Sequence, residues 1–243
     1  MKTEILFGVH PVAEALRAGR REISEILMAG GRSSPRSEAI ANQAAALKIP
    51  VRTVSSKKLT ALTGSDFHQG IAACVSPYPY VGIGDILRPA EPFLLILDSV
   101  VDTHNLGALI RTALCAGING VIIPKDRAAS PSPAVSKASA GALEHMAIVR
   151  ETNLVNVIRE LKAARIWIAG LDMAGDQTLY KGNLTGPLAL VVGGEEKGIR
   201  PLVRKQCDFL LSIPQEGPLN SLNASVAGAV VMYEAYRQRC HSA

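Results

Sequence analysis

The sequence lacks the features that mark several classes of protein. No stretch of about 18 apolar residues is free of charges and helix breakers, so no membrane span is expected. The first 21 residues carry acids within their apolar run and no small-residue cleavage site follows, so we interpret them as folded protein and not as a signal peptide. Aromatic residues make up 4% of the chain, which leaves few platforms for stacking single-stranded bases.

Cysteines are few and far apart. The chain has four, none in a Cys-x-x-Cys pair, and the histidines show no ligand spacing, so no zinc or other metal site is expected. Cys115 and Cys207 lie in apolar runs and are expected to be small core residues. Scattered unpaired cysteines suit a reducing compartment, and we expect a cytoplasmic protein.

Positive charge is concentrated near the N-terminus. The 243 residues carry a formal net charge of +5. Residues 1–77 hold ten Lys and Arg against six Asp and Glu, a net charge of +4, and the remainder carries +1. A basic N-terminal module fits an anionic partner such as RNA, although an ordinary soluble surface explains this charge equally well.

A segment rich in Pro and Gly, residues 75–92, divides the chain. We predict an N-terminal domain of residues 1–76, a linker of residues 77–91 and a C-terminal domain of residues 92–243. The first domain alternates helices and strands, with a polar, turn-rich loop at residues 63–70. Its expected helices are residues 11–17 and 37–47, the second with Ser37 as a candidate N-cap, and its expected strands are 22–28, 51–54 and 70–75.

The C-terminal domain repeats a rhythm of apolar strand and helix. Continuous apolar runs are typical of parallel strands that are buried on both faces, so we predict a parallel α/β sheet covered by helices. The expected strands are residues 93–97, 120–123, 166–169, 188–192 and 209–213, and the expected helices are 106–116, 154–164, 201–206 and 222–238. Ligands of such sheets bind beyond the carboxyl ends of the strands.

Polar segments follow three of these strands. In residues 97–113, Asn105 occupies a position suited to a helix N-cap, and Arg111 lies less than two turns further on. A capping role for Asn105 and a solvent-exposed role for Arg111 would explain this pattern as well as a functional site would. Residues 190–199 end a strand in two glycines, and Glu195 follows. The glycines form neither G-x-G-x-x-G nor a P-loop, which counts against a dehydrogenase on a Rossmann sheet.

The third polar segment spans residues 212–239. A strand ends near Ile213, and a helix follows that either Asn220 or Ser221 could cap. The cluster Asn220-Ser221-Leu222-Asn223 exceeds what capping requires. The helix is also rich in small residues, which indicates close packing in a tight core or at a subunit interface.

These three segments, in this order, resemble the three motifs of the SpoU/TrmH family of RNA ribose methyltransferases, within the SPOUT superfamily. The match covers about residues 93–239, and residues 10–16 (HPVAEAL) resemble the start of the family's small substrate-binding domain. The matching residues are, motif by motif, Asn105, Gly107 and Arg111; Gly193, Glu195 and Gly198; and Ile213, Pro214, Ser221, Leu222, Asn223, Ser225 and Ala227.

The resemblance implies a specific fold and reaction. Periodicity alone would indicate an unknotted sheet, whereas the family has a SPOUT-type parallel sheet with a deep C-terminal trefoil knot and works as a homodimer. It uses S-adenosylmethionine to methylate a ribose 2′-hydroxyl of structured RNA. The branch that the chain resembles acts on a guanosine of large-subunit ribosomal RNA. A transfer RNA methyltransferase and a non-catalytic RNA-binding protein are the alternatives.

The resemblance also implies roles for individual residues. Arg111 is expected to bind the RNA phosphate and to stabilise developing alkoxide charge, because arginine rarely gives up its proton. Asn105 would orient the substrate or Arg111, and Glu195 would hold Arg111 or the cofactor-side loop. Ser221 and Asn223 would complete the site by hydrogen bonds. The expected cofactor-binding residues are Gly193, Gly194, Gly198, Ile213, Leu222 and Asn223.

Overall fold

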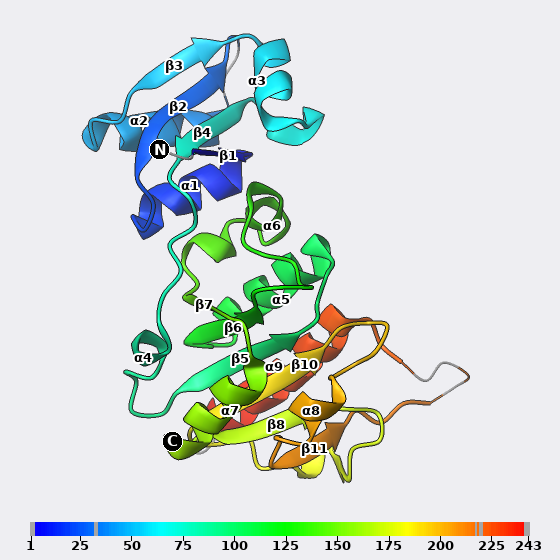
Figure 1. Ribbon diagram of the computed structural model, residues 1–243. Coiled ribbons are helices and arrows are strands. Elements are labelled where there is room, and N and C mark those ends of the chain that lie inside the picture. Colours follow the sequence, from blue (N-terminus) through cyan, green and yellow to red (C-terminus); the bar gives the residue numbers. More distant parts are fainter. Residues whose placement is uncertain (1–2, 32–33, 217, 219–220, 241–243) are drawn as a thin grey trace. The chain divides into compact units, whose positions relative to one another are not determined.

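Seven parallel strands form the larger sheet of the computed structural model (Figure 1), which describes residues 3–31, 34–216, 218 and 221–240. All the recorded pairings of this sheet are parallel. In spatial order the strands are β7 (Ile148–Glu151), β6 (Gly120–Pro124), β5 (Phe93–Asp98), β10 (Leu188–Gly193), β8 (Trp167–Leu171), β11 (Phe209–Ser212) and β9 (Gln177–Thr178). The predicted parallel α/β sheet is confirmed, and β7 and β9 are additional to the predicted strands.

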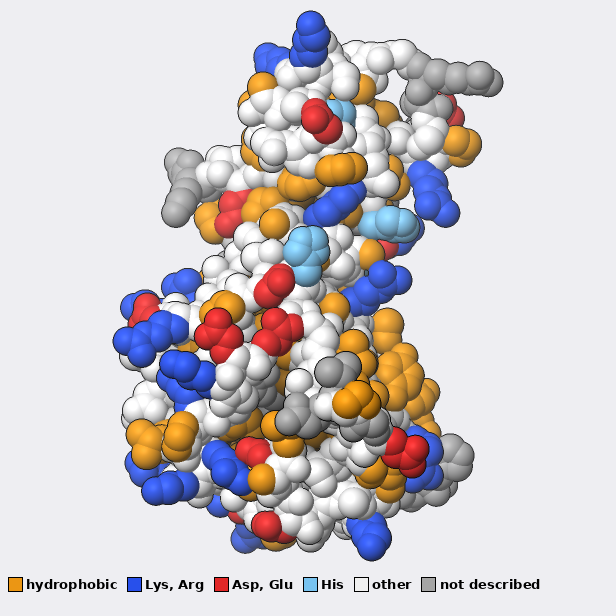
Figure 2. All heavy atoms as spheres, turned by 90° about the vertical axis from the view of Figure 1, so that its right-hand side faces the viewer, with side chains coloured by type: hydrophobic (Ala, Val, Ile, Leu, Met, Phe, Trp, Pro, Cys, Tyr) orange, Lys and Arg blue, Asp and Glu red, His pale blue; other side chains and the backbone are white. Residues whose placement is uncertain are grey.

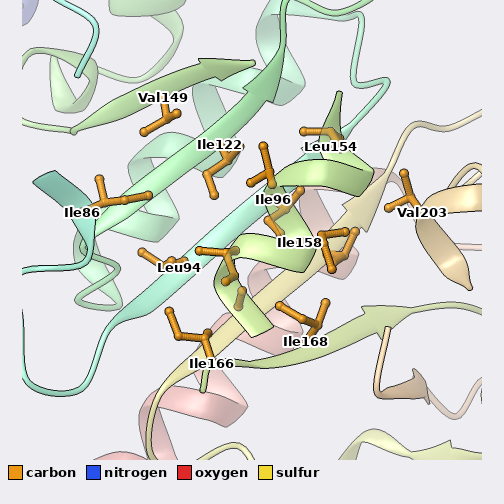
Figure 3. Packing of buried hydrophobic residues seen from close by; sticks show 14 of the residues in the cluster. Ile86, Leu94, Ile96, Ile122, Val149, Leu154, Ile158, Ile166, Ile168 and Val203 are labelled. Atoms are coloured by element: carbon orange, nitrogen blue, oxygen red, sulfur yellow. The ribbon is translucent and has the colours of Figure 1, made fainter. Parts of the chain in front are cut away.

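Helices cover both faces of this sheet. On one face lie α7 (Leu154–Ala163), α8 (Pro201–Arg204) and α4 (Ile83–Ile86), over the buried cluster of which Figure 3 shows Ile96, Ile122 and Ile158. The apolar residues of α7 recur at spacings of three and four, so one stripe of the helix is buried. Each such Leu or Ile side chain contributes about 1.5–3 kcal/mol when it is buried.

The other face carries α5 (Thr103–Cys115) and α9 (Ala224–Cys240), which contact each other, and α9 also contacts β10 (Figure 1). A Cβ atom added at Gly228 of α9 would come within 2.3 Å of Leu109 of α5. The small residues of the last helix therefore serve close packing, as predicted. None of the described helices is both long and apolar enough to cross a lipid bilayer.

A smaller, mixed sheet organises the N-terminal part of the chain. Its strands are, in spatial order, β1 (Glu4–Phe7), β4 (Ile71–Val75), β2 (Ile23–Ala29) and β3 (Val51–Val54), and only β2 and β3 pair in parallel. Its helices are α1 (Val9–Ala18), α2 (Pro35–Ala46), α3 (Ser56–Thr63) and the short 3-10 turn η1 (Asp66–His68). The predicted alternation of helices and strands is present, and β1 and α3 are additional to it.

Residues 131–145 pack with this N-terminal sheet, although they follow β6 in sequence. The structure divides into unit 1 (residues 1–79 and 131–145) and unit 2 (residues 80–130 and 146–243). The inserted segment contains α6 (Pro133–Ala138) and the 3-10 turn η2 (Ala142–Glu144). The predicted boundaries of the N-terminal domain, the linker and the C-terminal domain (residues 1–76, 77–91 and 92–243) stay a prediction.

A buried ion pair attaches the inserted segment to the rest of unit 1. Arg21 Nε lies 3.2 Å from a carboxylate oxygen of Glu144, and both side chains are 1% exposed. Arg21 also pairs with Glu4 at 3.0 Å, and the Ser136 hydroxyl donates to Glu144 at 2.7 Å. Burial raises the pKa of Glu144 more than the Arg21 guanidinium and the Ser136 hydroxyl lower it. The attachment therefore places a charged pair out of water.

Three predicted helix caps were wrong. Asp102 caps α5 by accepting from the His104 backbone N–H, which leaves the side chain of Asn105 available for other contacts. Ser34, not Ser37, caps α2, because the helix begins two residues earlier than predicted. Asn223, and not the candidate Ser221, caps α9 by accepting from the Ser225 and Val226 backbone N–H groups at 2.9 and 3.3 Å. The candidate cap Asn220 lies outside the described residues.

The two cysteines expected in the core differ. Cys207 is partly buried against the apolar cluster of unit 2, and burial raises the pKa of its thiol to about 12. Cys115 is exposed, so the expectation for it was wrong: it is the last residue of α5 and follows the exposed Leu114, outside the buried stripe of that helix.

Candidate active site

A cleft of about 770 Å³ lies where the carboxyl ends of β10, β8 and β11 meet. Two of the three predicted polar segments contribute to its wall, because they follow β10 and β11 directly. Its lining includes the predicted residues Gly193, Gly194, Glu195, Gly198, Ile213, Ser221 and Leu222. Asp172 and Met173, which follow β8, also line it and were not predicted. Their position after a parallel strand was the signal that could have identified them.

Glycines after β10 allow the backbone to fold back tightly beside the cleft. A Cβ atom at Gly193 would lie 2.1 Å from the carbonyl carbon of Gly198, and one at Gly194 would lie 2.2 Å from the carbonyl oxygen of Ser99. Gly198 itself adopts a left-handed backbone with φ of 59°. The missing side chains of Gly193 and Gly194 therefore let this stretch fold tightly, and its residues 193–199 line the cleft.

The other end of this stretch is held by Asp98, the last residue of β5. Asp98 is fully buried, and its carboxylate accepts from the Arg200 backbone N–H at 2.8 Å and from Arg200 Nε at 2.6 Å. The Gly194 N–H donates to the Asp98 carbonyl at 2.9 Å. Sequence reasoning missed this pair; an acid that ends an otherwise apolar strand was its only signal.

Three side chains, one from each motif, meet in a hydrogen-bond network. Asn105 Nδ2 donates to Glu195 Oε1 at 2.8 Å, and Asn223 Nδ2 donates to the same oxygen at 2.5 Å. Asn223 Nδ2 also lies 3.1 Å from Asn105 Oδ1. The side-chain amides of two distant segments are thus joined through one carboxylate, and Asn105, at 8% exposed, is nearly buried in the network.

Of the predicted catalytic residues, Ser221 and Arg111 do not belong to this network, and Ser221 lines the cleft whereas Arg111 does not. Arg111 is exposed on α5. No hydrogen bond or ion pair joins it to the described part of the chain. Asn105 and Arg111 therefore lie on the same helix, but only Asn105 contacts the other motifs.

The described residues include no group of three or more His, Cys, Asp or Glu side chains arranged to hold a metal ion. The site thus consists of a cleft lined by glycines and apolar residues together with charged ones, among them Asp172, Glu196 and Lys197. The Glu195 carboxylate, which also lines it, is held by two side-chain amides. Such a site can hold a flat, polar organic ligand through backbone hydrogen bonds.

Comparison with known proteins identifies this arrangement. Residues 92–233 match the family described as the SpoU rRNA Methylase family, and residues 5–81 match the family described as RNA 2′-O ribose methyltransferase substrate binding. The chain belongs to the SpoU rRNA methylase family. The predicted family is therefore confirmed, and its enzyme class replaces both the dehydrogenase and the non-catalytic alternative.

Relatives in this family match the chain from end to end. It is 39% identical to the 23S rRNA (guanosine-2′-O-)-methyltransferase RlmB of Pseudomonas putida, over 97% of each chain. It is 40% identical to the RlmB of Photorhabdus laumondii, over 98% of this chain and 99% of the relative. The solved structure of the SpoU methyltransferase AviRb from Streptomyces viridochromogenes, in complex with AdoMet, is 26% identical, with a TM-score of 0.85 over 97% of this chain and 90% of that chain.

Proposed function

We propose that this protein transfers a methyl group from S-adenosylmethionine to the 2′-hydroxyl of a guanosine in 23S ribosomal RNA, in the cytoplasm. The observation that carries the proposal is the meeting of Asn105, Glu195 and Asn223 beside the cleft. Relatives named for this reaction, at 39% and 40% identity over nearly the whole chain, support the choice of substrate. The match of residues 5–81 to a substrate-binding family supports RNA recognition by unit 1.

The cleft fits the methyl donor. The crowded positions of Gly193 and Gly194 admit no side chain, so their backbone groups can approach an adenosyl moiety closely. Gly198, Ile213 and Leu222 complete the proposed set of cofactor-binding residues, and apolar atoms of Ile213 and Leu222 can contact the base. Asn223 contributes through Glu195 and not by lining the cleft. The bound sulfonium supplies an electrophilic methyl group.

The ribose 2′-hydroxyl is a weak nucleophile, so the residues of the chain must position it and help to remove its proton. In the proposed site, Asn105 and Asn223 hold the Glu195 carboxylate, which fixes the edge of the cleft where the ribose enters. Ser221 lines this edge and can hydrogen bond to the ribose. Arg111 is exposed and without a partner in the described residues, so its guanidinium is available to bind an RNA phosphate and to stabilise alkoxide charge.

A homodimer is part of this proposal, and the outer face of α9 supports it. Three apolar side chains on that face, at spacings of seven and three residues, are between 44% and 50% exposed: Val226, Tyr233 and Tyr236. These spacings follow the seven-residue repeat of a helix seam. The inner face of α9 is already buried against α5 and β10, so we assign the outer face to a second copy of the chain.

The trefoil knot that the family resemblance implies is also proposed. Its support is the return of the chain's last helix to the centre of the sheet. α9 lies against β10, whose following loop lines the cleft, and against α5 of the first motif. Such a return lets the C-terminal segment and the loop after β10 form one site.

A methylation assay tests the proposed function. The purified protein is incubated with S-adenosylmethionine labelled in the methyl group and with either a 23S rRNA transcript or bulk transfer RNA. Nuclease digestion followed by mass spectrometry then identifies the modified nucleoside. We expect 2′-O-methylguanosine in the 23S transcript and its absence from the 23S rRNA of cells lacking the gene. Methylation of transfer RNA alone, or methylation of a base instead of the ribose, would overturn the proposal.

Two variants address Arg111 within the same assay. R111A should abolish transfer while calorimetric binding of S-adenosylmethionine persists, because Arg111 lies outside the cleft. R159A removes another exposed arginine, from α7, and should retain transfer. Full turnover by R111A would remove Arg111 from the mechanism.

A further inference from the structure

Phe67 is the most exposed of the large hydrophobic side chains in the described residues, at 78%. It lies in η1, within the turn-rich loop of residues 63–70. The other two aromatic side chains of unit 1 are less accessible than Phe67. Tyr78 is buried, and Phe7 is partly buried with Lys137 Nζ 5.9 Å from its ring centre. Unit 1 therefore presents one aromatic ring to solvent.

The loop around Phe67 is held in place by hydrogen bonds. Ser65 Oγ accepts from the Phe67 backbone N–H at 3.2 Å, and the Thr60 hydroxyl of α3 donates to Asp66 at 3.0 Å. His68, only 5% exposed, accepts from the Gly70 N–H through Nδ1 at 3.0 Å. An exposed ring on a fixed turn loses little conformational freedom on binding, which favours its use as a contact.

Cationic side chains border the same loop. Lys137 Nζ donates to Gln69 Oε1 at 3.0 Å, two residues after Phe67. Lys57 is exposed and lies one helical turn before Thr60, on the side of α3 that contacts Asp66. Figure 2 faces the side on which Figure 1 shows α3, and its upper part presents hydrophobic, Lys or Arg and His side chains together with an acidic one.

The positive charge of unit 1 favours a polyanion as its partner over a protein surface with few acidic residues. Unit 1 holds eleven Lys and Arg against seven Asp and Glu, a net charge of +4. Asp66 directly precedes Phe67, and its carboxylate accepts a hydrogen bond from the Thr60 hydroxyl. An exposed ring bordered by cations matches the chemistry that binds an unpaired base and its flanking phosphates.

We propose that Phe67 stacks on an unpaired base of the RNA substrate, while Lys57 and Lys137 contact the neighbouring phosphates. This inference rests on the proposed function only in taking RNA as the substrate. It assigns to η1, in unit 1, a part in substrate recognition, whereas the cleft that would hold the methyl donor is formed by residues of unit 2.

Kinetics with a 23S rRNA transcript test this role. F67A should raise the KM for RNA about 5- to 100-fold, the range expected for the loss of one stacked base. The kcat at saturating RNA and the Kd for S-adenosylmethionine should stay at wild-type values, and F67Y should restore the KM. L47A, which trims an exposed apolar side chain of the same unit, is the matched control and should leave the KM unchanged.

A fluorescence titration detects the stacking directly. Trp167 is the only tryptophan, and it is 60% exposed in unit 2. In the double variant F67W/W167F, the introduced indole should be quenched as transcript is added, with the salt dependence of phosphate contacts. Wild-type protein, which reports from Trp167 alone, provides the reference.

The outcomes separate this inference from the proposed function. Wild-type methylation of the transcript together with an unchanged KM for F67A overturns the role of Phe67 and leaves the function standing. Failure of the wild type to methylate any RNA overturns the function, whereas quenching of the F67W indole would still show base contact. A defect of F67A on ribosomal particles but not on naked transcript assigns Phe67 to a protein partner and overturns the stacking proposal.

Discussion

The carboxylate of Asp98 accepts two hydrogen bonds from Arg200, one from its backbone N–H at 2.8 Å and one from its Nε at 2.6 Å. The two residues are 102 positions apart, and Asp98 is fully buried at the end of β5. Between Gly193, which pairs with Asp98 in the sheet, and Arg200 runs the stretch that walls the cleft. Asp98 therefore closes this stretch into a fixed loop.

Replacing Asp98 should weaken cofactor binding. D98N keeps the size of the side chain but presents an amide to the Arg200 N–H, so one buried hydrogen bond to a charged group is lost, worth about 1.5–3 kcal/mol. If that energy maintains the loop, the Kd for S-adenosylmethionine rises about 10- to 100-fold by calorimetry. R200A keeps the backbone donor and should have a smaller effect. D85N, at an exposed acid of α4, is the control. Equal affinities for D98N and wild type would show that the loop is held by other contacts.

Because Asn105 and Asn223 share the Glu195 carboxylate, substitutions of these three residues should have similar, non-additive effects on catalysis. N105A and N223A each remove an amide donor to Glu195, and E195Q removes the acceptor charge. Each should lower kcat about 10- to 100-fold. The cofactor affinity should change less for N105A and N223A, because Asn105 and Asn223 lie outside the lining of the cleft. The double variant N105A/E195Q should be little worse than either single one, as expected for residues in contact. Additive losses in a double-mutant cycle would mean that the residues work independently.

Much of this site could be predicted from the sequence, because apolar runs reveal parallel strands and the carboxyl ends of such strands share one edge. Glu195, Ser221 and the glycines were found in this way and lie at the cleft. The contacts between loops could not be predicted. Asn105 has a pattern that suits a cap, and only the three-dimensional position of Glu195 shows why its amide is needed elsewhere.

Unit 1 shows a second limit of sequence patterns. Residues 131–145 follow a strand of unit 2 but pack with the N-terminal sheet, through the pairing of Arg21 with Glu144. Nothing local to either residue announces a partner more than a hundred positions away. Likewise, Asp102 replaced Asn105 as the cap of α5 because the helix begins three residues before the apolar periodicity does.

The outer face of α9 predicts a dimer that a single charge can disrupt. V226E places a carboxylate within the exposed apolar stripe of Val226, Tyr233 and Tyr236, where burial in an interface would leave it without a partner. Sedimentation at micromolar concentration should give a dimer for the wild type and a monomer for V226E, with the fold unchanged by circular dichroism. Trp167 is comparably exposed on β8, away from this helix, so W167E should remain dimeric. A wild-type monomer under these conditions would contradict the proposed assembly.

The buried pair of Arg21 and Glu144 predicts an unusual response of stability to substitution and to pH. E144A leaves Arg21 buried with Glu4 alone and should lower the free energy of unfolding by about 3–5 kcal/mol, whereas R21M/E144L should be close to wild type.

Burial raises the pKa of Glu144 from its ordinary value of 4.5, so the folded state holds the proton of this carboxyl group more tightly than the unfolded state. The stability that this proton contributes is complete below pH 4.5 and is lost as the pH rises through the folded pKa. Urea unfolding should therefore show that the wild type loses stability relative to E144Q as the pH rises above 4.5. E22Q, at an exposed acid of the same unit, should show no such trend. A difference between wild type and E144Q that grows in favour of the wild type with rising pH would mean that Arg21 outweighs burial.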